Sequence, residues 1–312
     1  MRPTITIAMA TCQGGRYLAA QLDSLARQSI TDWRLIVSDD GSTDETREIV
    51  REFAADRPDG QVTLIEGPQA GATANFLHLT SRIEPEGWFA FCDQDDVWQP
   101  DKLARAADFL EGQAGPAVYA ARTTICDQDL NVLTPAPALS RPLDFRNALV
   151  QACMPGNTIT GNAQALRMLQ RAAPHARAAG VISHDWWVYQ LMSGAGAALM
   201  RDRAQVLLYR QHRGNVMGRN DTMRARAARF SMLVDGNFAS WLAANVGALH
   251  PVEGMLTPPN RALLTRFDKA LRAPGPVAMA QFLRMGLYRQ TRGGTAALMG
   301  AALAGRLRNR PT

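Results

Sequence analysis

The sequence has no closely spaced cysteines. Its four cysteines, Cys12, Cys92, Cys126 and Cys153, are far apart and form no CxxC pair or metal-finger spacing. Cys12 and Cys92 fall inside apolar, strand-like runs, where a free thiol usually behaves as a small buried hydrophobe. This pattern excludes a disulfide framework and a zinc finger, and it predicts a protein of a reducing compartment.

Long apolar runs are also absent. The longest stretch of small and apolar residues, 295–305, is far shorter than the roughly 20 residues that a helix needs to span a bilayer. Residues 1–12 are too short, and too closely followed by polar residues, to be a signal peptide. The 312 residues are nevertheless 46% hydrophobic, enough for one large or two small packed domains. We therefore expect a folded cytoplasmic protein.

Lysine is nearly missing, and charge is unevenly distributed. Of 34 basic residues only Lys102 and Lys269 are lysines. Residues 201–312 hold 18 basic against 5 acidic residues, whereas residues 1–200 hold 16 against 23. A nucleic-acid-binding protein of this pI, about 9.5, would be basic more uniformly and would interleave aromatic residues with its basic ones. We expect no nucleic-acid partner.

The first half of the chain alternates strand-like and helix-like segments. Strands are predicted over 4–11, 33–38, 61–66 and 88–92, and helices over 17–28, from a cap at Ser42 or Asp44 to 55, 72–82 and 100–111. Further along, we predict a hairpin over 118–124 and 130–134, a strand over 157–160, a helix over 163–172, and Arg-rich helices after residue 209. Such alternation indicates βαβ units around a mostly parallel sheet.

Acidic residues follow two of the predicted strands. Asp39 and Asp40 end one strand, and the run Asp93-x-Asp95-Asp96 follows another. In an open parallel sheet, ligands bind at the carboxyl ends of the strands. Three carboxylates so close together favour a hard cation such as Mg²⁺ or Mn²⁺ with a phosphate ligand. The alternatives are ordinary ones: an acidic turn before a helix, and an Asx-type turn in the DDGS run.

At this point a resemblance emerges. The strings ATCQGGRYL, VSDDGSTDET, GATANF and FCDQDDVWQPDKL, in this order, resemble the inverting nucleotide-sugar glycosyltransferases of family 2, which have the GT-A fold. FCDQDDVWQPDKL, HDWWVYQL and YRQHRGNVMG look most like the bacterial rhamnosyltransferase branch. The resemblance covers about residues 4–218. It implies a Rossmann-like α/β fold, with a mostly parallel central sheet flanked by helices and a helical C-terminal extension.

The family pattern assigns roles to single residues. It places in the nucleotide-sugar site the residues Ala10, Thr11, Asp40, Asn75, Asp93 and Asp95. Asp40 would accept a hydrogen bond from the base, Asp93 would face the ribose, and Asp95 would bind the divalent metal. The sequence departs from the pattern at Cys12, where family members often have Tyr or Phe, so the base would pack more weakly or on another residue. No P-loop lysine or GxGxxG run is present to hold the phosphates, which favours a metal.

Other residues receive supporting roles. His212 would complete the metal shell or contact a phosphate, or would be merely structural, and Arg210 and Arg213 could pair with the diphosphate. Asp96 would support the metal loop. The pair Gly161-Asn162 matches a segment on the acceptor side, and otherwise forms a strand-to-helix turn.

The string HDWW offers a general base for the acceptor hydroxyl. The family pattern makes Asp185 the catalytic base, with His184 orienting it and Trp186 beside it. The alternative is a helix that begins with Ser183 or Asp185 as its N-cap, followed by core tryptophans, and with a His184 that only packs. Both interpretations stay open at this stage.

The C-terminal region is predicted to be a separate helical segment. We expect a nucleotide-sugar half over residues 1–115, an acceptor half over 116–230 and an Arg-rich helical region over 231–312. A helix from Pro276 would carry Met279, Phe282, Leu283, Gly286 and Leu287 on one face and arginines off it. Such a helix suits either an anionic lipid surface or a solvated arginine face on a packed helix.

These observations predict a metal-dependent inverting glycosyltransferase. Its partners would be a dTDP- or UDP-sugar and a glycan or lipid-linked glycan acceptor of bacterial surface polysaccharide synthesis, with rhamnose as the sugar that the local motifs suggest. It would work in the cytoplasm or peripherally at the inner face of the plasma membrane. The alternative is a nucleotidyltransferase, or another phosphoryl-transfer enzyme, with the same aspartates.

Overall fold

The computed structural model describes residues 2–212 and 237–308 of the chain. They divide into two compact units, one built from residues 2–138, 154–173 and 197–212 and the other from residues 139–153, 174–196 and 237–308. This division differs from the three consecutive segments expected from the sequence. The C-terminal helices share their unit with residues 139–153 and 174–196, so one unit collects segments that are far apart in the chain.

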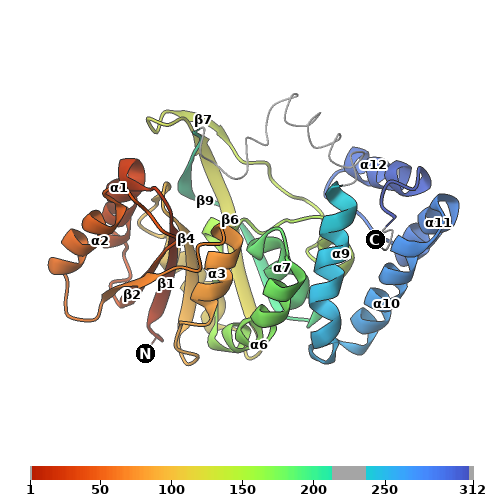
Figure 1. The fold of residues 1–312 in the computed structure, drawn as a ribbon, viewed down its shortest axis with the longest axis horizontal. Coiled ribbons are helices and arrows are strands. Elements are labelled where there is room, and N and C mark those ends of the chain that lie inside the picture. Colours follow the sequence, from red (N-terminus) through yellow and green to blue (C-terminus); the bar gives the residue numbers. More distant parts are fainter. Residues whose placement is uncertain (1, 213–236, 309–312) are drawn as a thin grey trace. The chain divides into compact units, whose positions relative to one another are not determined.

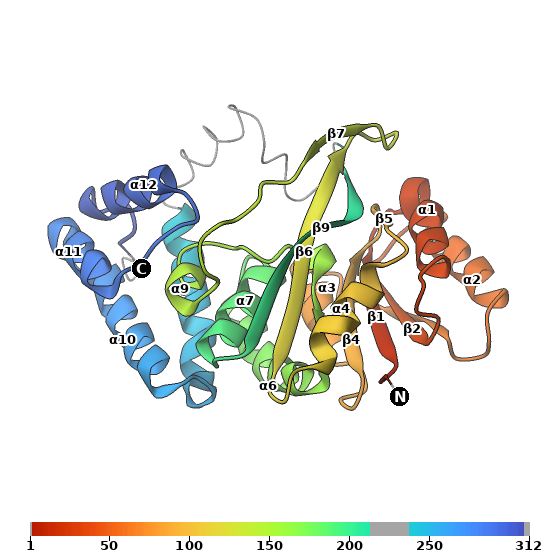
Figure 2. The same cartoon turned by 180° about the vertical axis from the view of Figure 1, so that it is seen from behind.

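The first unit contains a nine-stranded mixed sheet (Figures 1 and 2). Its main path runs in the order β3-β2-β1-β4-β8-β6-β9-β5, and β7 pairs with β6. The strands are β1 (Ile5–Thr11), β2 (Trp33–Asp39), β3 (Val62–Glu66), β4 (Trp88–Asp93), β5 (Val97–Trp98), β6 (Ala117–Cys126), β7 (Val132–Pro135), β8 (Thr160–Gly161) and β9 (Ala198–Arg210). The first four pair in parallel, and β6 and β9 also run parallel, as Figure 2 shows. The expected mostly parallel α/β fold is confirmed.

Helices cover both faces of the parallel strands. Alternate residues of β4 divide between two layers, as a side-chain period of two requires. Ala90 and Cys92 belong to a core shared with α1 (Gly15–Ala26), α2 (Thr46–Ala55) and α4 (Lys102–Glu111). On the other face, the Phe91 ring lies 5.4 Å from that of Phe76 in α3 (Ala72–Thr80). This layering brings the ends of β1, β2 and β4 to one edge, at matched register.

The second unit is helical. It contains α5 (Phe145–Ala148), α7 (His184–Gly194), α9 (Asn237–Leu249), the short 3-10 helix η2 (His250–Met255), α10 (Pro258–Arg272), α11 (Gly275–Met285) and α12 (Arg292–Leu303). The long helix α6 (Ala163–Ala179), with Pro174 inside it, contributes to both units. The C-terminal helices are tied to residues 139–153 by hydrogen bonds, among them Asn147 Nδ2 to the Tyr288 carbonyl at 3.0 Å. No helix within the described ranges is both long and apolar enough to cross a bilayer.

The predicted amphipathic helix from Pro276 was wrong in its extent and its face. Helix α11 ends at Met285, because Gly286 adopts the left-handed conformation (φ 66°) that terminates helices. Leu283 is 58% exposed, whereas Phe282 is buried and its ring lies 5.5 Å from that of Phe267 in α10. The buried face of α11 therefore packs on a neighbouring helix.

Two other local expectations were wrong, and one long strand was missed. Residues 157–160 are mostly a 3-10 helix, η1 (Gly156–Thr158), followed by the two-residue strand β8. The long strand β9 was not predicted, because its sequence, ALMRDRAQVLLYR, mixes charged and apolar residues without strict alternation. Neither Ser42 nor Asp44 occupies the N-cap of α2, which is Glu45 without a side-chain cap.

Candidate active site

A buried aspartate joins the ends of β1 and β2. Asp39 is fully buried, and its carboxylate accepts hydrogen bonds from the Thr11 hydroxyl at 2.9 Å, the Ser42 amide at 2.9 Å and the Ser42 hydroxyl at 2.6 Å. The bond to the Ser42 amide is the Asx-type turn considered above. Asp39 is thus a structural residue of the loop, and its neighbour Asp40 is the more accessible of the pair.

Asp40 organises the loop between β3 and α3. Its two carboxylate oxygens accept hydrogen bonds from the amides of Gln69 at 2.6 Å and Gly71 at 2.8 Å. Gly67 passes so close that a Cβ there would lie 2.8 Å from Asp40 Oδ1, which explains a glycine at this position. The Asp40 carboxylate thus already accepts two hydrogen bonds within the protein. Its predicted hydrogen bond to the nucleotide base stays a prediction.

The acidic loop after β4 forms a compact cluster of carboxylates. Asp93, Asp95 and Asp96 can each direct one oxygen so that all three lie within 4.8 Å of one another. Asp93 and Asp95 are half-buried, and Asp96 is fully buried. Carboxylates this close repel one another unless they bind a cation or a proton.

Asp96 is the buried member of the cluster and is hydrogen-bonded to Asn157 and Arg210. Its Oδ2 accepts a hydrogen bond from Asn157 Nδ2 at 2.6 Å, and its Oδ1 accepts one from the Arg210 amide at 3.3 Å. Burial raises the pKa of Asp96 well above its usual range; the charges of Asp95 and Asp93 raise it further, and the Asn157 hydrogen bond opposes this rise. This environment fits a supporting role rather than that of a solvated ligand.

His212 lies against the acidic loop. Its Nε2 is 2.7 Å from Asp95 Oδ2, and both side chains are about 15% exposed (16% and 15%). The imidazole also contacts the ring of Tyr17 from α1, with centroids 4.8 Å apart. A residue 117 positions away in sequence thus contacts Asp95 where both side chains are partly exposed, and a carboxylate with an imidazole is a chemically suitable pair of metal ligands.

Arg210 braces the loop instead of facing solvent. Its Nε donates to the Asp95 carbonyl at 2.8 Å, its guanidinium donates to the Gln128 carbonyl at 2.5 Å, and its Cζ lies 4.6 Å from the Tyr17 ring centroid. The side chain is buried, so these contacts do not support the predicted pairing with a diphosphate. Arg213, the other arginine considered, lies outside the described residues.

The remaining predicted nucleotide residues lie at the same edge of the sheet. Ala10 is half-buried near the end of β1, at matched register with Asp93 of β4. Asn75 in α3 is buried, and its Nδ2 donates to the Ser38 carbonyl at 2.7 Å, so it ties α3 to the end of β2. Thr11 and Asn75 use their side chains within the protein, and the predicted contacts of these residues with a nucleotide stay predictions.

Lys102, a buried lysine that follows the acidic loop in the sequence, contacts the ring of Trp98. Lys102, at the start of α4, is fully buried, and its Nζ is 3.4 Å from the ring centroid of Trp98. Within the described part of the chain, this Nζ has no hydrogen-bond partner. Burial lowers the pKa of Lys102 to about 7, although the Cys92 thiol and the Asp96 carboxyl act in the opposite direction.

The predicted catalytic base belongs to the second unit. Asp185 is half-buried in the first turn of α7, where the Trp186 amide donates to its Oδ1 at 2.7 Å and the Ser183 hydroxyl also bonds to it. Ser183 is the N-cap residue of α7, so Asp185 is not needed as the cap. Burial lowers the pKa of the preceding His184 to about 4, with Asp185 opposing, which leaves that imidazole neutral at neutral pH. Trp186 is a core residue stacked on Phe238, with centroids 5.8 Å apart.

Gly161 and Asn162 lie at the other end of β4 from the acidic loop. Gly161 pairs with Phe89, and Asn162 accepts hydrogen bonds from the amides of Ala117 at 3.2 Å and Ala165 at 3.0 Å. These contacts describe the strand-to-helix turn that the sequence left open, and the structure does not bring the pair to the acidic cluster.

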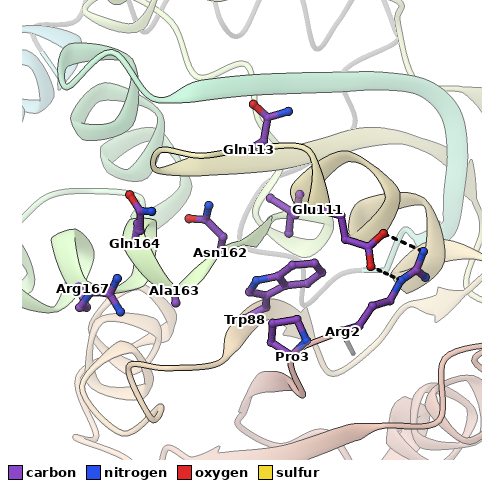
Figure 3. Close-up of a pocket in the computed structure, with 10 residues that line it drawn as sticks. Arg2, Pro3, Trp88, Glu111, Gln113, Asn162, Ala163, Gln164 and Arg167 are labelled. Carbon is purple, nitrogen blue, oxygen red and sulfur yellow. Dashed lines mark hydrogen bonds and ion pairs between the residues drawn. The ribbon is translucent and has the colours of Figure 1, made fainter.

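A pocket of about 350 Å³ is present at this opposite edge (Figure 3). Trp88 and Asn162 line it, and Arg2 and Glu111, which also line it, form an ion pair at 2.6 Å. Because it lies at the opposite edge of the sheet from the acidic cluster, we assign it no role in the chemistry.

Sequence reasoning missed several residues of the site. Tyr17, Gln94, Lys102 and Asn157 received no role, although Gln94 and Lys102 lie inside or near the recognised acidic string. Lys102 could have been noticed as one of only two lysines. Tyr17 lies inside the recognised string ATCQGGRYL but received no role, and Asn157 carried no signal; only the folded chain brings them to the acidic loop.

Comparison with known proteins decides the family. The model of glycosyl transferase family 2 matches residues 6–173, more than half of the chain. The chain belongs to glycosyltransferase family 2. It is similar to the dTDP-rhamnosyl transferase RfbG of Shigella flexneri, at 26% identity over 231 residues, which cover 72% of this chain and 78% of the relative.

Solved structures confirm the GT-A-like fold of this glycosyltransferase. Residues 1–349 of TarS from S. aureus, in complex with UDP-GlcNAc, align with a TM-score of 0.54 at 13% identity, covering 97% of this chain and 90% of that one. The mannosyltransferase PcManGT from Pyrobaculum calidifontis, in complex with GDP-Man and Mn²⁺, aligns with a TM-score of 0.53 at 18% identity, covering 98% and 86%. Family membership favours transfer of a sugar from a nucleotide-sugar donor over the phosphoryl-transfer alternative.

Proposed function

We propose that this glycosyltransferase is a metal-dependent, inverting enzyme that moves a sugar from a nucleoside-diphosphate donor to a glycan hydroxyl in bacterial surface polysaccharide synthesis. The similarity to a dTDP-rhamnosyl transferase, which extends over 72% of the chain, supports dTDP-rhamnose as the first donor to test. UDP-sugars are the second choice, since TarS binds UDP-GlcNAc.

The pair formed by Asp95 and His212 carries the proposal. Their side chains meet at 2.7 Å beside Asp93, at the carboxyl ends of the parallel strands. Two carboxylates and an imidazole fit Mn²⁺ or Mg²⁺, and a Mn²⁺-bound structure with this fold supports the assignment. When bound, the cation would neutralise charge on the departing diphosphate.

Asp185 acts as the general base in this proposal. Its carboxylate takes the proton from the acceptor hydroxyl, whose oxygen attacks C1 of the sugar while the bond from C1 to the diphosphate breaks. Attack from the opposite face inverts the anomeric centre, and the nucleoside diphosphate leaves. The Ser183 hydroxyl and the Trp186 amide both bond to Asp185 and so orient its carboxylate.

A thermal-shift screen tests donor and metal together. dTDP, UDP, GDP and their sugars are added with Mn²⁺, with Mg²⁺ and with chelator; ligand binding raises the unfolding temperature in proportion to affinity. Asp95→Asn is expected to abolish the metal-dependent shift and the release of nucleoside diphosphate. Asp129→Asn, at an exposed position in the turn between β6 and β7, is the matched control. Full turnover by Asp95→Asn would refute the metal role.

A second variant separates binding from chemistry. Asp185→Asn should bind donor and metal like the wild type but lower kcat by about 10²- to 10⁴-fold, the usual contribution of a general base. The anomeric configuration of the product, determined by NMR, checks inversion. Unchanged kcat in Asp185→Asn, or retained configuration, contradicts this part of the proposal.

We also propose a lipid-linked acceptor, reached by peripheral contact of the second unit with the inner face of the plasma membrane. Val277 and Leu283 of α11 are 46% and 58% exposed, and Arg284, which follows Leu283 in the sequence, is also exposed. Apolar and basic side chains on one helix suit an anionic bilayer. Flotation with vesicles containing anionic lipid, compared between the wild type and Leu283→Ser/Arg284→Ser, tests this contact; equal flotation would refute it.

A further inference from the structure

Gln94, which lies between Asp93 and Asp95 in the acidic loop, hydrogen-bonds to the backbone of the loop that follows β1. Its Oε1 accepts a hydrogen bond from the Cys12 amide at 2.9 Å, and its Nε2 donates to the Cys12 carbonyl at 2.9 Å. One side-chain amide thus pairs with both polar groups of a single residue, as a neighbouring strand would. The contact joins positions that are 82 residues apart.

A glycine makes room for this side chain. A Cβ at Gly14 would lie 2.3 Å from Gln94 Oε1 and 2.8 Å from its Cδ. Both atoms belong to the far end of a flexible side chain, so a methyl group at position 14 would displace Gln94 rather than unfold the loop. The glycine and the glutamine are therefore two halves of one contact.

The loop after β1 has a separate set of anchors on its other side. The amides of Gln13, Gly14 and Gly15 donate to the side chains of Ser42 at 2.9 Å, Thr46 at 2.7 Å and Asp44 at 2.9 Å. These bonds hold the loop to the region that follows β2. They would persist without Gln94, so loss of Gln94 releases the loop from the acidic residues and leaves its other attachments in place.

We propose that Gln94 is a positioning residue that couples nucleotide binding to metal binding. The inference rests on the proposed function, in which Asp93 and Asp95 hold the metal and the end of β1 lines the nucleotide site. Gln94 lies between these aspartates and is hydrogen-bonded to Cys12. A nucleotide that orders the loop after β1 therefore also orders the acidic loop. By linkage, the metal then strengthens nucleotide binding by the same factor.

The test measures this factor directly. Titration calorimetry gives the Kd of dTDP, and of UDP, with saturating Mn²⁺ and with chelator, and the ratio of the two Kd values is the coupling. In Gln94→Ala we expect the ratio to fall about tenfold, because the loop loses both of its hydrogen bonds to Cys12. Gln164→Ala is the matched control, since this exposed glutamine donates to the Ala114 carbonyl at the opposite edge.

A double-mutant cycle distinguishes coupling from general damage. Gly14→Ala alone should reduce the ratio as Gln94→Ala does, because its methyl group displaces the glutamine. The double variant Gly14→Ala/Gln94→Ala should be no worse than Gln94→Ala, since the methyl group then fills vacated space. Gly14→Ala also provides the test if Gln94→Ala fails to fold.

The outcomes separate this inference from the proposed function. A wild-type protein whose nucleotide affinity depends on Mn²⁺, together with an unchanged ratio in Gln94→Ala and Gly14→Ala, refutes the role of Gln94 alone. Strictly additive effects in the double variant also refute it. A wild-type protein that binds neither nucleotide with Mn²⁺ refutes the proposed function, and the coupling with it.

Discussion

The buried Lys102 should titrate near neutral pH. Its ammonium group is fully buried against the Trp98 ring, which lowers its pKa from 10.5 to about 7. At 1.36 kcal/mol per pH unit, this fall corresponds to about 5 kcal/mol that disfavours the charged form in the folded protein. Between pH 7 and 10.5 the unfolded chain therefore binds more protons than the folded one at this residue, and the free energy of unfolding should rise with pH across this window.

The chain makes this prediction easy to measure, because it has only two lysines. In protein labelled with ¹³C at lysine Cε, Lys102 and Lys269 give one signal each, and Lys269→Met assigns them. We expect the Lys102 signal to titrate with a midpoint near pH 7. A midpoint of 10 or above would refute the reasoning.

Stability gives an independent measure. Urea unfolding of wild type and Lys102→Met at pH 6, 8 and 10 should show that the difference between them changes by several kcal/mol in favour of the wild type as pH rises. Lys269→Met, which removes an exposed ammonium group, is the control. A difference that is constant across pH contradicts the lowered pKa assigned to Lys102.

Three further variants test contacts of the site. Gly161→Ala should destabilise the protein by about 1–3 kcal/mol in urea unfolding, because its Cβ would lie 2.4 Å from the buried ring of Phe89; wild-type stability would contradict this close contact. Asn157→Leu should cost about 3 kcal/mol, since the buried Asp96 loses its 2.6 Å hydrogen bond, and a neutral effect would mean that Asp96 finds another partner. Ser183→Ala should cost about 1 kcal/mol and lower kcat without changing the donor Kd; an unchanged kcat would separate the N-cap from catalysis.

Much of the first unit could be predicted from local sequence. The strands β1, β2, β3 and β4 are short apolar runs bounded by turn residues, and their helices carry regular apolar spacing, so periodicity located them within a few residues. Strand β9 escaped prediction, and the strand expected over 157–160 was misplaced relative to β8, because pairing with β6 and β4, rather than their own pattern, makes these segments strands. The apolar face of α11 was misassigned because Gly286 ends that helix.

The acidic residues at the strand ends follow from sequence alone, since the ends of parallel strands must meet at one edge of a sheet. The residues that contact these acidic side chains cannot be predicted from the sequence alone. Asn157 beneath Asp96, His212 beside Asp95 and Gln94 against Cys12 depend on contacts across 61 to 117 positions. Sequence by itself therefore determined the family, the sheet and the place of the carboxylates. Only the tertiary structure decided that Asp96 and Lys102 are buried and that Arg210 hydrogen-bonds to the backbone of the acidic loop. Burial depends on residues that are distant in the chain.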